Sequence, residues 1–301
     1  MNEDPTPAAH PRTGFALGLS AYALWGVLPL YFKAIEHIPP VNIVAHRVLW
    51  SVPLLAAMVV VLKRGPMLRQ VASHRRTIGM LVVTALLIAG NWLLYVWAVT
   101  NGHILAASFG YYLNPLANVL LGRFVLNEKL NRLQWIAVAI AAAGISILAA
   151  GALSQLWISL ALCASFALYG LFRKIVAADA LVGLTVETII LLPAAMLWLG
   201  YQAAGHTPVM GTSPHDTGLL LLAGLVSTTP LLLFTAAAKR LQLSTMGMLQ
   251  FIAPTLQFMI AILYGEPLKL AHFIAFPAIW LALVLYATAL LRSPQLPQPP
   301  E

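Results

Sequence analysis

Charged residues are scarce in this sequence, and cysteine is almost absent. Only 9% of the 301 residues are Asp, Glu, Lys or Arg, whereas about a quarter of the residues in a soluble domain are charged. Cys163 is the single cysteine, so neither a disulfide framework nor a multi-cysteine metal site is available. No Walker phosphate-binding motif is present, which argues against direct use of ATP. We therefore expect a protein that is not an ordinary soluble domain and that needs no cofactor and no metal.

Long apolar runs take the place of the missing charges. Hydrophobic residues make up 60% of the chain, and a membrane-spanning helix needs about 20 mostly apolar residues in succession. Apolar runs between helix breakers predict an all-α integral membrane protein with ten transmembrane helices, five in each half. The first five predicted spans are residues 14–31, 41–62, 78–99, 104–126 and 133–150. The last five are residues 156–172, 181–201, 219–238, 243–264 and 273–291.

The Lys and Arg residues gather on one side of the predicted spans. Such residues are retained in cytoplasmic loops. With the amino terminus inside, Lys33 and Lys269 lie outside, Arg47 falls within a span, and fourteen of the 17 basic residues are cytoplasmic. The cytoplasmic set is Arg12, Lys63, Arg64, Arg69, Arg75, Arg76, Arg123, Lys129, Arg132, Arg173, Lys174, Lys239, Arg240 and Arg292. The net charge of +8 thus reflects topology rather than binding to nucleic acid, and we expect a multi-pass bacterial inner-membrane protein with both termini in the cytoplasm.

The predicted spans divide the chain into two halves. We expect a cytoplasmic tail at residues 1–13, a first half at 14–150, a second half at 151–292 and a disordered proline-rich tail at 293–301. Connections are short except at residues 206–217, where Gly, Pro, Ser and Asp break any helix. No soluble domain fits between the spans.

The two halves also share an ordered series of similar positions. Pro115 aligns with Pro254, and the same offset places Tyr112 on Phe251. The further aligned pairs are Ala98 and Ala237, Ile104 and Leu243, Glu128 and Glu266, Pro53 and Pro193, and Arg47 and Glu187. Because each half has five spans, the second half enters the membrane from the opposite side, so the repeat is inverted. Inverted repeats suit alternating access around a site at the midplane.

Arg47 is the clearest candidate for a binding residue. It lies about six residues inside the second span, roughly 9 Å deep at 1.5 Å per residue, and a charge at that depth needs a partner or a wet cavity. It could bind a substrate carboxylate or another anion, or it could form an ion pair that locks helices together. His46 beside it could modulate that charge or titrate near neutrality, although an adjacent position faces elsewhere on a helix, which favours ordinary packing.

Glu187 lies at a similar depth in the seventh span, which starts from the opposite face. It could bind a substrate ammonium group or exchange a proton with a coupled flux. The alternative is a neutral, hydrogen-bonded carboxyl held between helices. In a simple inverted arrangement the charges of Arg47 and Glu187 lie in different leaflets and need not touch.

Amide and aromatic side chains complete the candidate substrate-binding set. Tyr111, Asn114 and Asn118 share one helix face around Pro115, and the equivalent face in the second half carries Gln250 and Gln257 around Pro254. Both faces could line a central polar slot, although hydrogen bonding between helices is the commoner use of such residues. The remaining candidates are Asn91 in the third span and the aromatic residues Tyr22 and Trp25 in the first.

Several motifs resemble a known family. They are AYALWGVLPLYFK, AHRVLWS, GNWLLYVWAV, ASFGYYLNPL, LNEKLNRLQW, SFALYGLFRK, VETIILLP, LSTMGMLQFIAPT and YGEPL. Together they resemble the RarD branch of the EamA family, within the drug/metabolite transporter superfamily, over nearly the whole chain. The resemblance implies ten helices in two inverted five-helix EamA repeats, cytoplasmic termini and a central cavity that opens alternately to either side. RarD proteins are customarily called chloramphenicol-sensitive or drug-type permeases.

These observations favour a secondary transporter that exports a small amphipathic or zwitterionic metabolite or drug. Its expected partners are the small-molecule substrate and the lipid bilayer, with possible proton coupling through Glu187 or His46. A membrane receptor that binds its ligand without flux is one alternative. A membrane-embedded enzyme is another, but it would need a nucleophile and base, a metal cluster or paired carboxylates, and the sequence shows no such pattern.

Overall fold

The structure is a bundle of α-helices. A computed structural model describes residues 11–101, 103–149, 156–205, 209–263 and 270–292, and these residues contain no strand. The helices of the first half are α1 (Pro11–Ala34), α2 (Pro40–Val61), α3 (Gly65–Ser73), α4 (Arg75–Thr100), α5 (Ile104–Phe124) and α6 (Arg132–Ala149). Those of the second half are α7 (Leu156–Ile175), α8 (Ala180–Ala204), α9 (Pro214–Ala238), α10 (Leu243–Gln250), α11 (Ile252–Leu263) and α12 (Leu270–Arg292).

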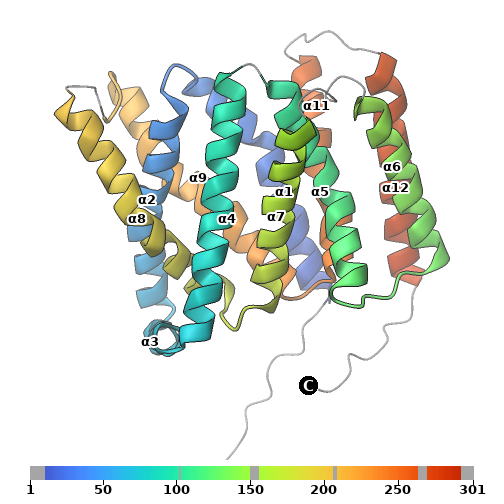
Figure 1. The fold of residues 1–301 in the computed structure, drawn as a ribbon, viewed down its shortest axis with the longest axis horizontal. Coiled ribbons are helices and arrows are strands. Elements are labelled where there is room, and N and C mark those ends of the chain that lie inside the picture. The colour runs from blue at the N-terminus through green and yellow to red at the C-terminus, as the bar shows by residue number, and fades with distance from the viewer. Residues whose placement is uncertain (1–10, 102, 150–155, 206–208, 264–269, 293–301) are drawn as a thin grey trace, which may run out of the picture.

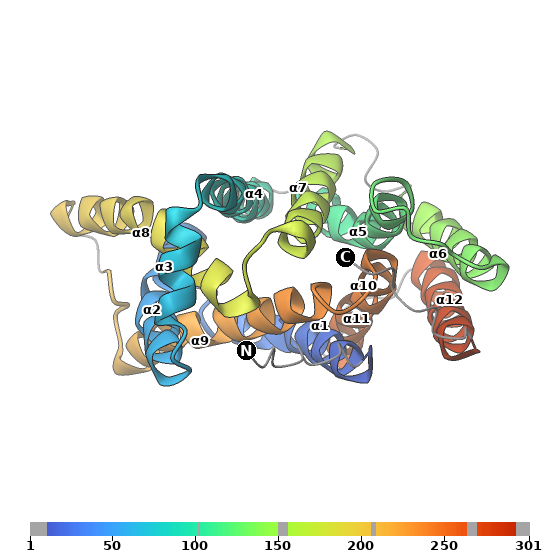
Figure 2. The ribbon, with the colours of Figure 1, turned by 90° about the horizontal axis from the view of Figure 1, so that it is seen from below.

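The long helices run between the same two ends of the bundle (Figure 1). We call the end at which α1 begins and α12 ends the lower end, as it is drawn, and the other the upper end. Seen from below, the helices form two rows (Figure 2). One row contains α8, α4, α7, α5 and α6, and the other contains α2, α9, α1, α10 with α11, and α12. Each row therefore draws helices from both halves of the chain.

Length and apolar composition explain the long helices. Eight of the described helical segments are long and apolar enough to cross a membrane, and all ten predicted apolar spans fall on helices. The span of α6 is shorter by that measure, at Arg132–Ile147. Large apolar side chains such as Val61, Leu197 and Leu263 are at least 75% exposed on the outside of the bundle, which suits contact with lipid rather than water.

Two elements differ from the prediction. The segment predicted as a connection after the second span contains α3, whose Val71 is buried. The predicted ninth span is interrupted at Phe251, where α10 ends and α11 begins. Because Pro254 has no N–H, the carbonyl of Gln250 loses its helical hydrogen-bond partner. At the same break, the Phe251 N–H bonds to the Met248 carbonyl three residues earlier, not to the carbonyl four residues earlier as in a regular α-helix.

The largest buried cluster of the described residues draws on α1, α2, α4, α7, α8, α9, α10 and α11. Five of its aromatic rings, from α1, α7 and α9, have centroids 5.6–6.2 Å apart, and they belong to Tyr22, Trp25, Phe166, Tyr169 and Phe234. Offset and edge-on aromatic pairs at this spacing stabilise a core beyond the burial of their area. This cluster fixes α1 against α7 and α9, beside the pocket described below.

Some predicted features lie outside the described residues. They are the tail 293–301, residues 1–10 of the amino-terminal tail, part of the long connection at 206–208, and Glu266 and Lys269.

Candidate binding pocket

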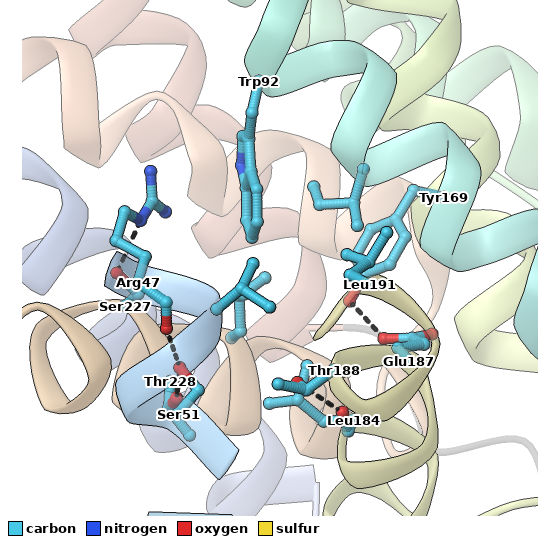
Figure 3. A pocket seen from close by; sticks show the side chains of 13 residues that line it. Arg47, Ser51, Trp92, Tyr169, Leu184, Glu187, Thr188, Leu191, Ser227 and Thr228 are labelled. Atoms are coloured by element: carbon cyan, nitrogen blue, oxygen red, sulfur yellow. Dashed lines mark hydrogen bonds between the residues drawn. The ribbon is translucent and has the colours of Figure 1, made fainter. Parts of the chain in front are cut away.

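A small pocket lies between five helices, α2 and α4 from the first half and α7, α8 and α9 from the second (Figure 3). Its volume is about 20 Å³, counted as positions for the centre of a water-sized sphere, which is room for one or two water molecules. The lining residues are Arg47, Val48, Ser51, Ile88, Trp92, Tyr169, Leu184, Glu187, Thr188, Leu191, Ser227, Thr228 and Leu231. The two charged residues predicted from the sequence, Arg47 and Glu187, therefore line one cavity, from its opposite sides.

Arg47 reaches the pocket from α2, about 10 Å along the helix from Pro40 at the upper end. Its Nε donates a hydrogen bond of 2.6 Å to the Ser227 hydroxyl on α9. Its guanidinium carbon lies 4.3 Å from the centroid of the Trp92 ring on α4, a cation–π contact. No described carboxylate lies within 4.0 Å of the guanidinium. Its charge is thus held in place without being neutralised.

Glu187 occupies the other side of the pocket and is almost fully enclosed. Its Oε1 lies 3.5 Å from Nη1 of Arg173, and both side chains are at most 2% exposed. Thr84 donates a hydrogen bond of 2.5 Å to Oε1, and the Tyr169 hydroxyl donates one of 3.4 Å to Oε2. The carboxylate is therefore paired and hydrogen-bonded inside the protein, which is the condition under which a buried charge is tolerated.

Arg173 reaches Glu187 because α8 has a glycine one turn before it. A Cβ at Gly183 would clash with Nη1 of Arg173, so only glycine leaves room for the guanidinium. The Nη2 of Arg173 donates to the carbonyls of Asp179 and Ala180, at 3.4 and 3.2 Å, where α8 begins. Arg173 was predicted to be one of the cytoplasmic topology charges. Its side chain is 0% exposed.

The other predicted residues lie outside the lining of this pocket. Asn91 bridges three helices: its amide nitrogen donates to the Leu162 carbonyl and the Ser165 hydroxyl, and its oxygen accepts from Tyr111. These bonds engage both polar atoms of the Asn91 side-chain amide in contacts between helices. Asn91 and Tyr111, two separately predicted substrate-binding residues, are therefore joined by a contact between helices in this conformation.

A second polar group lies between α5 and α10. The Asn118 amide donates a hydrogen bond of 3.1 Å to the Gln250 side chain, so the two predicted faces do meet. Asn114 is 0% exposed, and neither atom of its side-chain amide has a partner within the described structure. Gln257 is exposed and donates to the backbone carbonyl of Trp25.

Tyr22 belongs to the aromatic cluster and is fully buried, with a hydroxyl that has no partner among the described residues. His46 is also 0% exposed. One of its ring nitrogens lies 2.7 Å from the Val209 carbonyl, and the other accepts a hydrogen bond from Trp50. A neutral His46 ring that carries its proton on Nε2 satisfies both contacts. Neither partner, Val209 or Trp50, is among the residues that line the pocket.

Comparison with known proteins gives the pocket its context. The EamA-like transporter family matches residues 12–150. Protein RarD of Escherichia coli K12 is 43% identical over 288 residues, which cover 93% of this chain and 95% of that protein. The chain belongs to the EamA-like transporter family. An uncharacterized transporter of Vibrio cholerae is 44% identical, with 94% of each chain covered.

Two further similarities extend this family assignment. The chloramphenicol-sensitive protein RarD of Pseudomonas aeruginosa is 33% identical and covers 90% of this chain and 92% of its own. A protein of known crystal structure matches with a TM-score of 0.72 over 94% of this chain and 100% of its own, at 18% identity, which shows the shared fold. This member of the family is thus a multi-pass membrane transporter, in agreement with its apolar helices.

Sequence reasoning missed most of the pocket of this family member. The sequence pattern placed Arg173 in a loop, and it did not single out the hydroxyl residues Ser51, Ser227 and Thr228 as candidates. Single hydroxyl residues within apolar spans are common and carry no periodic signal. The glycine at 183, one turn before a buried Glu, was the one signal that a large side chain had to lie against that helix face. No group of three or more His, Cys, Asp or Glu residues suited to a metal occurs in the described part of the chain.

Proposed function

We propose that the chain is a secondary transporter that moves a small amphipathic metabolite, or a drug of similar shape, by alternating access through the pocket. One observation carries the proposal. Five helices from both halves line a cavity that contains a half-buried arginine, Arg47, whose charge no described carboxylate neutralises. A charge inside a membrane is costly to keep and generally marks a substrate or ion pathway.

Helix packing supports two inverted repeats. In the repeat, α1 corresponds to α7, α2 to α8, α4 to α9, α5 to α10 with α11, and α6 to α12. The contact of α5 with α7 therefore corresponds to that of α11 with α1, and the contact of α4 with α7 corresponds to that of α9 with α1. Likewise, the contact of α2 with α9 corresponds to that of α8 with α4. The pairs α6 with α12, α2 with α8, and α5 with α10 map onto themselves, and all of these pairs are in contact. Such a two-fold pattern suits two halves that rock around a shared site.

The small pocket represents an occluded arrangement in this proposal. At the lower end, Lys174 donates to the backbone carbonyls of Ala238 and Leu241, and Lys239 donates to that of Val176. These bonds tie α7 to the connection between α9 and α10. The basic residues favour the lower end as the cytoplasmic side, so cytoplasmic entry requires these contacts to open, and the substrate leaves at the upper end.

The tie at the lower end includes Glu128 in the connection between α5 and α6. Its carboxylate accepts from the backbone N–H groups of Leu243 and Ser244, and from the Ser244 hydroxyl. A carboxylate at a helix amino terminus satisfies otherwise unpaired N–H groups. Glu128 therefore holds α10 in place next to the lysines.

Further roles are proposals for the same pathway. Asn91, Tyr111, Asn114, Asn118 and Gln250 would line a wider cavity once the bundle opens. Tyr22, Trp25 and Gln257 would face the substrate path beside them. Proton coupling through Glu187 predicts that Glu187→Gln abolishes the pH dependence of transport, and an active variant that keeps it would remove that role. The same test applies to His46→Gln.

The transport proposal is tested in proteoliposomes of purified protein. Vesicles loaded with a mixture of metabolites are diluted into buffer, and the solutes that leave faster than from protein-free vesicles are identified by mass spectrometry. We expect selective efflux, accelerated when the same solute is present outside. A ligand that stabilises the protein without crossing the membrane would instead support the receptor alternative.

A further inference from the structure

The guanidinium of Arg47 presents an unused pair of donors to the pocket. Nε already donates to Ser227, and among the described residues no acceptor binds Nη1 or Nη2. The two Nη groups of an arginine match the two oxygens of a carboxylate. The Trp92 ring beside the guanidinium and the Ser227 contact restrict its rotation, so the donors are held in a fixed direction.

Ser227 offers a further donor at the same place. Its hydroxyl oxygen accepts from Arg47, and its own proton has no acceptor among the described residues. The hydroxyls of Ser51, Thr188 and Thr228 differ from it, because each already donates within the protein. Ser227 and Arg47 therefore form a cluster in the described lining with O–H and N–H donors free for an anion.

The opposite side of the pocket lacks the complementary group for a cation. Glu187 is its only described carboxylate, and Arg173, Thr84 and Tyr169 already engage both of its oxygens. An ammonium group would have to displace Arg173, which is fully enclosed. With Glu187 neutralised by Arg173, the pocket retains one uncompensated positive charge, that of Arg47.

Apolar side chains also line the pocket. They include Leu184, Leu191 and Leu231. Such a surface stabilises a hydrocarbon body and penalises a second charged group that finds no partner.

We propose that the substrate is an organic monoanion, a carboxylate on an apolar body without an ammonium group. Once the bundle opens and this pocket of about 20 Å³ widens, the carboxylate binds Nη1 and Nη2 of Arg47 and the Ser227 hydroxyl, and the apolar body lies along the leucine side chains. This inference rests on the proposed transport function and narrows it, because a zwitterionic amino acid would leave its ammonium group unpaired.

The test compares matched compounds on the protein in lipid nanodiscs. Each set has one body and three charge patterns: 3-phenylpropionate, phenylalanine and phenethylamine; and hexanoate, norleucine and pentylamine. Binding is measured by calorimetry and by thermal stabilisation. We expect each carboxylate to bind at least about tenfold more tightly than its amino acid, since the amino acid also has to bury an ammonium group that finds no partner, which costs about one such factor or more, and the amines to bind weakest.

Variants separate charge recognition from folding. Arg47→Gln should remove the difference between the three compounds of each set, Arg47→Lys should keep part of it, and Ser227→Ala should weaken carboxylate binding several-fold. Arg69→Gln, which removes an exposed arginine on α3, is the matched control and should bind as the wild type does. The comparison of compounds on the wild-type protein needs no variant and remains valid if a variant misfolds.

The outcomes distinguish this proposal from the transport function. Equal or tighter binding of the amino acids or amines overturns the monoanion class, as does the absence of binding by both carboxylates. In either case, selective efflux from proteoliposomes would leave the transport function standing. Carboxylate binding that depends on Arg47 but produces no flux would support the monoanion class and overturn transport.

Discussion

Arg47 and Arg173 both lie near the same pocket, but Arg47 is half-buried whereas Arg173 is fully buried, and they are held in different ways. Arg173 lies against Gly183, forms an ion pair with Glu187 and donates to two backbone carbonyls. Arg47 has a hydroxyl and an aromatic face as neighbours and no described carboxylate. Removing Arg173 would leave a buried negative charge without its partner, whereas removing Arg47 would leave none.

This difference separates structural from functional charge within one membrane protein. A paired and fully enclosed arginine contributes to a unique arrangement of helices, although the pair as a whole need not stabilise the fold. Arg47 is half-buried without a counter-charge, which costs stability and is explained by what it binds. The consequences can be measured as changes in the free energy of unfolding.

Arg173→Met should give the largest loss of stability. It leaves Glu187 charged and unpaired in a site that is at most 2% exposed, and breaking a buried pair in this way costs about 3–5 kcal/mol. Denaturant or thermal unfolding in detergent micelles measures the change. The double variant Arg173→Met with Glu187→Gln should recover most of the loss, and a double variant as unstable as the single one would show that packing rather than charge is responsible.

Gly183→Ala should destabilise less, but by the same route. The new methyl group would occupy the position of the Arg173 guanidinium and force it away from Glu187, and overpacking of this kind costs about 1–3 kcal/mol. Gly200→Ala on the same helix is the matched control, because nothing lies within 4 Å of a Cβ there. We expect the control to be neutral or slightly stabilising, since alanine favours helix. Equal effects of the two variants would contradict the close fit of Arg173 against Gly183.

Lys239, just after α9 at the lower end, should make the free energy of unfolding depend on pH. Burial, together with the nearby charges of Arg173 and Lys174, lowers the pKa of Lys239 from 10.5 to about 8. The folded state then binds fewer protons than the unfolded state between about pH 8 and 10.5, so this residue makes stability rise with pH across that interval. Unfolding of the wild type and of Lys239→Met should differ in slope there. Lys129→Met, which removes an exposed lysine, controls for the loss of a lysine, and a wild-type slope in Lys239→Met would disprove the assignment.

The long helices could be predicted from the sequence because the membrane imposes a simple rule on composition. Runs such as residues 181–201 must be helical to satisfy their backbone, and α8 covers that run. The interruption at Phe251 was harder to predict, since Pro254 can be accommodated by a kink as well as by a break. The short helix α3 lies outside the apolar runs and gives no signal of that kind.

The pocket was predictable only in its charges. Arg47 and Glu187 stand out because charges are rare in apolar spans, and both line the cavity. The partner of Glu187 could not be predicted, because Arg173 lies at the end of a helix where a charge normally reaches water. Which charges are neutralised depends on distances between helices, and a single sequence does not contain them.

Arg47→Met should have the smallest effect on stability, and its sign is the sharpest test of the comparison. No described carboxylate is left behind, and methionine replaces a half-buried charge by an apolar chain of similar length, so we expect stability within about 1 kcal/mol of the wild type or above it. The same unfolding measurement applies, with Arg173→Met as the reference. A loss as large as that of Arg173→Met would mean that the contacts with Ser227 and Trp92 hold the fold together, and Arg47 would then be a second structural arginine. A stable variant that no longer binds carboxylates would assign the cost of burying Arg47 to substrate recognition.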